Sequence, residues 1–166
     1  MPGPVMNIDS VQVTREMRHG DRFGATVSRI APHVGAKKLG YNLTVVEPGK
    51  RAFPFHNHHA NEEMFFVIEG TGKLRFGKDE YPLRTGDVVA CPPGGPEVAH
   101  QIVNTGSAPL RILAVSTMID IDIWQYPDSN KWGAAGGRDP GKPPTEATFP
   151  GRYVREAESL EYWDGE

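Results

Sequence analysis

Residues 49–70 read GKRAFPFHNHHANEEMFFVIEG, and residues 86–104 read GDVVACPPGGPEVAHQIVN. Each stretch begins at a glycine and combines histidine with a short run of apolar, β-forming residues. In the first stretch, Met64–Ile68 is apolar on both faces, which predicts a central strand that is covered on both sides. We expect the core to cover one face and a partner subunit to cover the other.

Short β-rich runs surround these two stretches, and each is bounded by Gly or Pro turns. In Lys73–Phe76 the apolar and charged residues alternate, as in a strand with one solvated side. With 19 Gly and 15 Pro in 166 residues, the chain holds too many helix breakers for a helical bundle. The spacing predicts an all-β sandwich or barrel. The expected strands are Tyr41–Val46, Glu63–Ile68, Lys73–Phe76, Asp87–Ala90, His100–Val103 and Leu110–Ser116.

The length suits a single domain over residues 1–166. We place the barrel at about residues 41–117. Residues 1–40 have no sustained period, and residues 127–151 carry five Pro and five Gly, so both flanks are predicted to be irregular extensions. The C-terminal extension covers about residues 127–166. The aromatic residues within Tyr153–Trp163 are expected to dock on the barrel or on another subunit.

The charge balance excludes several partners. The formal net charge is −3, and no basic patch of the kind that binds nucleic acid is visible. No apolar run approaches the roughly 18 residues that span a bilayer, and Met1–Ser10 does not resemble a signal peptide. A single cysteine, Cys91, suits a reducing compartment. We therefore expect a cytoplasmic protein that binds neither nucleic acid nor membrane.

Histidine is concentrated at two places. In His56-Asn57-His58, an extended backbone directs both imidazoles to one face. Glu63 follows five residues after His58, and His100 opens a separate strand. Three imidazoles and a carboxylate suit Fe, Mn, Ni, Cu, Co or Zn. The alternatives are a solvent-exposed histidine pair, a charged turn at Glu63 and a core histidine at position 100.

Both stretches resemble the conserved motifs of the cupin superfamily. The first motif is matched by Gly49, the His56/His58 pair, Glu63 and Gly70, with one residue more than usual before His56. The second motif is matched in order, with three extra residues before its histidine. Its matching residues are Gly86, Pro92, Gly94, His100 and Asn104.

The resemblance implies a double-stranded β-helix, also called a jelly-roll barrel, with a small-molecule ligand in its lumen. It also implies that His56, His58, Glu63 and His100 hold a divalent transition metal. The residues Phe53, Phe55, Phe65, Val67, Phe76 and Ile102 are candidates for the lumen wall or the packing behind it. The flanking sequence is similar to stand-alone bacterial cupins of an uncharacterised group, and cupins commonly form dimers, so we expect a homodimer.

Three functions from different classes fit this sequence, and whether the chain is an enzyme stays open. The first is a metal-dependent oxidoreductase, such as a dioxygenase, in which the metal acts as a Lewis acid. The second is a non-catalytic module that binds or senses a sugar or carboxylate. The third is a sugar isomerase or epimerase, for which Lys50, Arg51, Arg75 and Arg84 are available to bind phosphate. Other residues are expected in minor roles: Glu62 as an exposed charge or a partner of an imidazole, His59 at the rim, and Cys91 in packing.

Overall fold

The structure is a computed structural model that describes residues 3–137 and 147–166. Its strands are β1 (Arg15–His19), β2 (Phe23–Arg29), β3 (Leu39–Val46), β4 (Asn57–His58), β5 (Glu63–Glu69), β6 (Thr71–Phe76), β7 (Asp79–Arg84), β8 (Val88–Cys91), β9 (His100–Asn104), β10 (Leu110–Thr117), β11 (Asp122–Tyr126), β12 (Lys131–Gly136) and β13 (Phe149–Arg155). Short 3-10 turns lie at η1 (Ile8–Ser10), η2 (Ala31–Val34), η3 (Pro96–Val98), η4 (Pro127–Ser129) and η6 (Glu156–Glu158).

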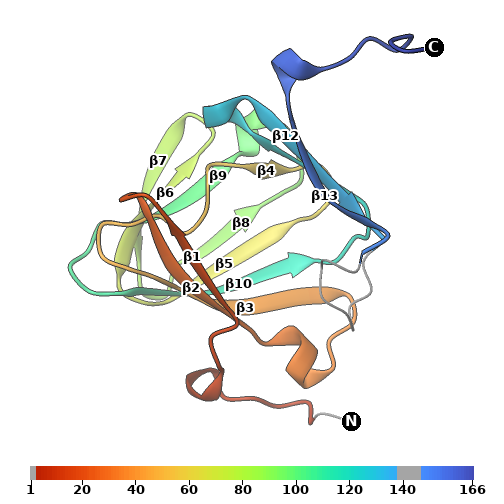
Figure 1. Cartoon of the computed structure of the whole chain (residues 1–166). Helices are drawn as coiled ribbons and strands as arrows, with labels where there is room; N and C mark the ends of the chain where they lie inside the picture. The colour runs from red at the N-terminus through yellow and green to blue at the C-terminus, as the bar shows by residue number, and fades with distance from the viewer. Residues whose placement is uncertain (1–2, 138–146) are drawn as a thin grey trace.

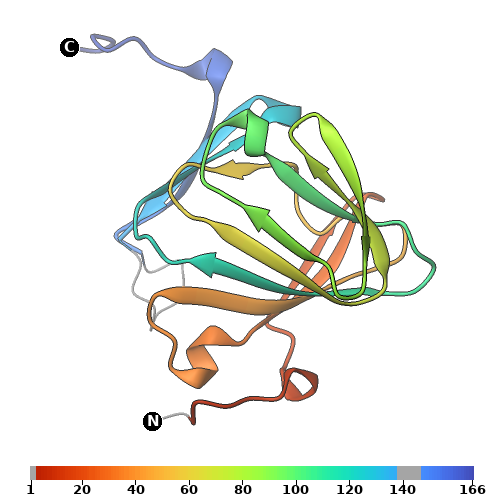
Figure 2. The same cartoon turned by 180° about the vertical axis from the view of Figure 1, so that it is seen from behind.

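The strands pair antiparallel in three sheets that curve into a barrel (Figures 1 and 2). The largest sheet has the order β1-β2-β3-β10-β5-β8, and β7-β6-β9 faces part of it. The third sheet, β13-β12-β11-β4, lies along one end. This architecture is the double-stranded β-helix, so the predicted all-β jelly-roll fold is confirmed. None of the helices among the described residues is long and apolar enough to cross a membrane.

The six strands predicted from the sequence are all present, with ends that differ by at most two residues. Gly70 alone joins β5 to β6, and its φ of 94° is open mainly to glycine. A Cβ at this position would lie 2.8 Å from the carbonyl oxygen of Pro109. The motif glycine is therefore required by both the turn and the close approach of the β9–β10 loop.

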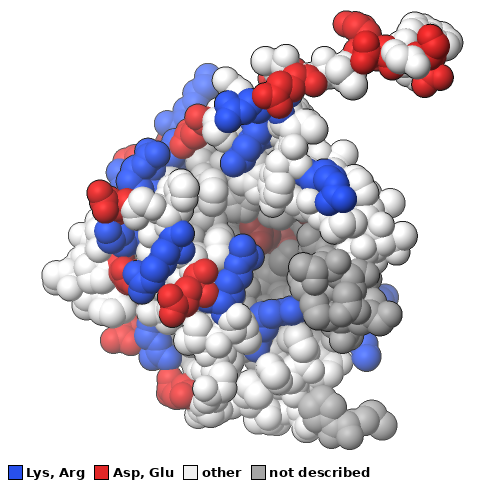
Figure 3. Space-filling model, in the orientation of Figure 1, with Lys and Arg blue, Asp and Glu red and all other residues white. Residues whose placement is uncertain are grey.

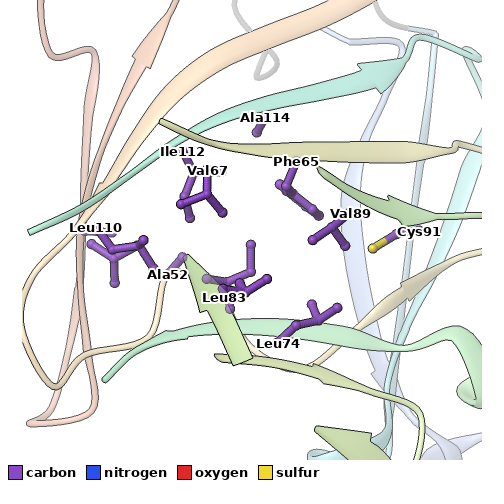
Figure 4. Packing of buried hydrophobic residues seen from close by; sticks show 13 residues of the cluster. Ala52, Phe65, Val67, Leu74, Leu83, Val89, Cys91, Leu110, Ile112 and Ala114 are labelled. Carbon is purple, nitrogen blue, oxygen red and sulfur yellow. The ribbon is translucent and has the colours of Figure 1, made fainter. Parts of the chain in front are cut away.

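The core lies between the large sheet and the β7-β6-β9 sheet (Figure 4). Leu74 and Leu83 come from one side and meet Val67 and Ile112 from the other, and all four are at most 5% exposed. Of the predicted lumen residues, Phe65, Val67 and Ile102 belong to this core, and Phe53 and Phe76 pack against it. Phe55 is buried elsewhere, with the Arg75 guanidinium 4.2 Å above its ring.

Both extensions contain regular structure that the sequence did not indicate. In the N-terminal part, β1 and β2 continue the large sheet, and in the C-terminal part β12 and β13 pair beside β11. Tyr153 therefore docks on the barrel within β13, as expected. Leu160, Tyr162 and Trp163 do not dock on this chain, because the C-terminal segment projects away from the barrel (Figures 1 and 2) and these side chains are at least 75% exposed. Part of the Pro- and Gly-rich extension, residues 138–146, lies outside the described residues.

Candidate metal centre

Three backbone segments position the four predicted ligands. His58 lies on β4, which pairs with β11. Glu63 opens β5 and His100 opens β9. His56 forms a two-way bridge with His100: the His56 amide donates to the His100 carbonyl at 3.1 Å, and the reverse bond is 2.7 Å. The fold thus converts two distant motifs into one cluster at the end of the barrel.

The imidazoles converge on one oxygen. The Oε2 atom of Glu63 lies 3.0 Å from Nε2 of His100, 3.6 Å from Nε2 of His58 and 3.8 Å from Nε2 of His56. The ligand atoms of His56, His58 and Glu63 all lie within 4.8 Å of one another, so this group is able to hold a metal ion. His100 stands at the edge of the same cluster through its contact with Glu63.

The other ring nitrogen of each histidine faces a hydrogen-bond acceptor. Nδ1 of His56 lies 2.8 Å from the Pro54 carbonyl, and Nδ1 of His100 lies 3.2 Å from the Val98 carbonyl. Nδ1 of His58 lies 2.6 Å from the Asp122 carboxylate. These partners place the proton on Nδ1 and leave Nε2 with its lone pair directed into the cluster.

In this tautomer the cluster is suited to bind a metal ion. With the proton on Nδ1, Nε2 of His100 and the Glu63 oxygen are both acceptors, so their 3.0 Å approach needs a cation between them. A divalent transition metal meets that need for all the donors together. Three nitrogens and one carboxylate oxygen form a donor set that such metals prefer over Mg or Ca.

Asp122 is the member of the site that sequence reasoning missed. It opens β11, is 5% exposed, and accepts hydrogen bonds from the Asn61 side chain at 2.9 Å and the Ala60 amide at 3.1 Å. Burial opposes its ionisation, but the hydrogen bonds from His58 and Asn61 lower its pKa to about 2. Asp122 is therefore an anion that fixes the ring of His58. Glu62, the carboxylate considered from the sequence, is exposed.

Burial and charge also set the protonation of the cluster itself. Loss of water, together with the neighbouring His100, lowers the pKa of His56 to about 4. Burial opposes the ionisation of Glu63, but the His100 hydrogen bond and the imidazole charges lower its pKa to about 2. At neutral pH the site thus presents a neutral imidazole at His56 and a carboxylate, the forms that bind metal.

The remaining side chains singled out from the sequence lie outside the cluster. His59 is exposed and stacks on Trp132, with ring centroids 5.3 Å apart. Cys91 is 1% exposed in the core, where burial raises the pKa of its thiol. Gln101 faces the other side of its strand and bonds Arg75 and the Phe53 carbonyl.

Space for a ligand lies at the mouth of the barrel. Beneath the histidines the barrel leaves a gap of only about 20 Å³, next to Phe65 and Ile112. On the mouth side, His58 and Glu63 form part of a cavity of about 270 Å³ that Arg29 and Lys37 also line. We call this cavity the first recess. Figure 3 shows a hollow on this side of the molecule, with acidic atoms at its floor and basic side chains around it.

A double-stranded β-helix with imidazoles and a carboxylate gathered at its mouth defines a class of small barrels able to hold a metal. A sequence model of the cupin domain matches residues 42–116, which span both motifs. Residues 42–116 thus form a cupin domain.

Solved structures agree with this assignment. A sugar phosphate isomerase of the cupin superfamily from Silicibacter pomeroyi is 25% identical, with a TM-score of 0.77 over 97% of this chain and 98% of its own. A structure from Acidithiobacillus ferrooxidans, described as a candidate sugar phosphate isomerase, is 29% identical. Its TM-score is 0.66 over 82% of this chain and 80% of its own.

Curated relatives match shorter parts. An uncharacterised protein of Methanocaldococcus jannaschii is 34% identical over 61 residues, which are 37% of this chain and 46% of the relative. Auxin-binding protein 1 of Arabidopsis thaliana is 29% identical over 103 residues, which are 57% of this chain and 50% of the relative. The chain thus spans about half the length of the curated relatives it matches.

Proposed function

We propose that this chain is a metal-dependent isomerase of a phosphorylated sugar. The observation that carries the proposal is the composition of the first recess, where Arg29 and Lys37 share one cavity with His58 and Glu63. Arg29 lies on the same face of β2 as the buried Ala25 and Val27, at the exposed end of the strand. Cations beside a metal site suit a sugar whose phosphate is held at one end and whose oxygens face the metal.

His56, His58, Glu63 and His100 are proposed to hold the metal, one of Fe, Mn, Ni, Cu, Co or Zn. When bound, the metal acts as a Lewis acid that polarises a sugar carbonyl. Asp122 holds the imidazole of His58 in its ligating tautomer, and Arg29 and Lys37 bind and orient the phosphate.

Two solved structures that each match at least four fifths of this chain, described as a sugar phosphate isomerase and a candidate for that activity, support the same substrate class. They favour this function over the two alternatives, an oxidoreductase and a non-catalytic binding module. The four cations considered from the sequence, Lys50, Arg51, Arg75 and Arg84, are not among the described residues that line the first recess. Lys50 instead bonds the Asp21 carbonyl, and Arg75 pairs with Asp128.

Substitution of the recess cations tests this function. With metal-loaded protein and fructose 6-phosphate, we expect the Arg29→Gln and Lys37→Gln variants each to raise KM roughly tenfold or more, because each removes a charge-assisted hydrogen bond. Nuclear magnetic resonance in D₂O would follow conversion of the sugar. The matched control is Arg84→Gln, an exposed arginine at the far end of β7.

The same assay separates the alternatives. If glucose binds as well as glucose 6-phosphate, the phosphorylated-sugar function is wrong. If phosphorylated sugars bind tightly without conversion at any metal loading, the chain is the non-catalytic binder instead.

We also propose a homodimer that pairs through the outer face of the large sheet. Phe66 on β5 lies between Val88 on β8 and Leu113 on β10 in one row of neighbours. Val88 is 67% exposed and Phe66 37%, and the three strands lie side by side in Figure 2. A second copy on this face would supply the outer cover expected for Met64–Ile68, since burial of apolar area gains about 25 cal/mol per Å².

Light scattering tests this interface at micromolar concentration. We expect a dimer for the wild type and a monomer for the Val88→Glu variant, because the change places a charge in an apolar contact. The control is Leu160→Glu on the projecting C-terminal segment. If that variant dissociates the dimer while Val88→Glu does not, the sheet face is not the interface.

The cytoplasm remains the predicted compartment, consistent with the buried, unpaired Cys91.

A further inference from the structure

A second recess opens on the other side of the metal cluster. Its volume is about 290 Å³, and its floor includes His56, whereas the floor of the first recess includes His58 and Glu63. The ring centroids of His56 and His58 are only 5.1 Å apart. Each recess therefore reaches a different histidine of the same cluster.

The second recess carries its own pair of cations. Arg15 lies on β1 on the same face as Met17, and both line the recess. Lys131 opens β12, and its Nζ lies 4.7 Å from the ring centroid of Tyr126. Among the described lining residues of this recess, none is acidic. Arg15 and Lys131 are thus positioned to bind an anion.

Aromatic rings hold this recess beside the cluster. The ring of Tyr126 stacks on His56, with centroids 6.0 Å apart and planes 23° apart, and Tyr153 packs on Tyr126 at 6.1 Å. The walls are therefore uncharged, and the positive charge of the recess comes from Arg15 and Lys131.

The charges of the metal cluster and of the two recesses indicate what kind of ligand would fit them. Glu63 and Asp122 line the first recess and supply two negative charges, which a divalent metal would neutralise, and each recess adds two cations. Figure 3 shows basic side chains on several sides of the hollow around its acidic floor. A substrate with a single phosphate engages one pair of cations and leaves the other without a counter-charge.

Resting on the proposed function, we propose that the substrate is a phosphorylated sugar with a second anionic group at its other end. One end lies against Arg29 and Lys37, and the other against Arg15 and Lys131. The sugar carbons between them lie over the cluster. The second group is a phosphate or a carboxylate, which share the charge and the oxygen acceptors that this recess would recognise.

Calorimetry on the metal-loaded, full-length protein tests this assignment with three probes. These are fructose 6-phosphate, fructose 1,6-bisphosphate and 6-phosphogluconate. We expect at least one of the two doubly anionic probes to bind tenfold or more tightly than fructose 6-phosphate. Which of them binds more tightly identifies the second group as phosphate or carboxylate.

Variants locate the source of that advantage. Arg15→Gln and Lys131→Gln should each remove most of it and leave the affinity for fructose 6-phosphate within twofold of wild type. Arg29→Gln should weaken all three probes. The matched control, Arg84→Gln, should change none of them. Thermal unfolding of each variant confirms that the fold is retained.

The outcomes separate this inference from the function on which it rests. If no phosphorylated probe binds, the proposed function fails. If fructose 6-phosphate binds but neither doubly anionic probe binds more tightly, only the second anionic site is overturned. The same holds if the advantage persists in both the Arg15→Gln and Lys131→Gln variants, since metal chelation would then explain it.

Discussion

The His56→Ala variant is expected to bind a divalent transition metal at least about a hundredfold more weakly than the wild type. Its imidazole contributes one of the Nε2 atoms that surround Glu63, 3.8 Å from the carboxylate oxygen. Even the hydrogen-bond partners of ligands are worth about 10- to 100-fold in metal affinity, so loss of a ligand should cost at least as much. Competition against a chelating dye gives the affinity, and elemental analysis of the purified protein gives the metal content.

His59→Ala provides the matched control for this experiment. It removes an imidazole only three residues away, one that stacks on Trp132 and lies outside the cluster. We expect its metal affinity to equal that of the wild type. Wild-type affinity in the His56→Ala variant would show that the metal is held elsewhere, and an equal loss in both variants would point to a general effect of the segment.

Asp122→Asn is expected to weaken metal binding about 10- to 100-fold without removing any ligand. The carboxylate lies 2.6 Å from Nδ1 of His58 and holds the proton on that nitrogen. An amide in its place competes less well for the proton and can turn its NH₂ group towards the ring. The imidazole of His58 then loses its fixed tautomer, and its Nε2 lone pair is no longer always available.

Nitrogen magnetic resonance of the imidazoles distinguishes this positioning role from a purely structural one. We expect the His58 signals of the Asp122→Asn variant to report a mixture of tautomers, whereas the wild type reports one. Asp79→Asn, on the exposed start of β7, is the control. Unchanged metal affinity together with an unchanged His58 tautomer would contradict the role assigned to Asp122.

Local chemistry explains why the motifs could be interpreted from the sequence. Alternation along an extended segment places His56 and His58 on one face, and the positive φ angles at Gly70 and Gly86 require glycine whatever the rest of the chain does. Asn104 likewise has a local role, since its amide oxygen accepts the Gly106 amide at 2.9 Å in the turn after β9. Each requirement acts over a few residues, so neighbouring positions of the sequence are enough to indicate it.

Strands β7 and β12 were not predicted from the sequence, and the structure gives a physical reason for each. β7 is an edge strand with a proline, Pro82, and mostly charged or exposed side chains, so it lacks an apolar period. β12 is rich in Gly and Ala, and at Gly133 the reason is that the Trp124 ring lies directly over the backbone and leaves no room for a Cβ. Its small residues suggested a loop, yet they are what allows the strand to pack.

The β-barrel, the cupin motifs and the four candidate metal ligands could be predicted from the sequence, because they depend on alternation and on turns that span few residues. The side chains that surround the ligands are brought there by tertiary packing. Asp122 lies 64 residues from His58 along the chain, and Arg15 on β1 shares a recess with Lys131 on β12 only in the folded chain. Such pairings follow from the packing of distant strands, and no local pattern encodes them.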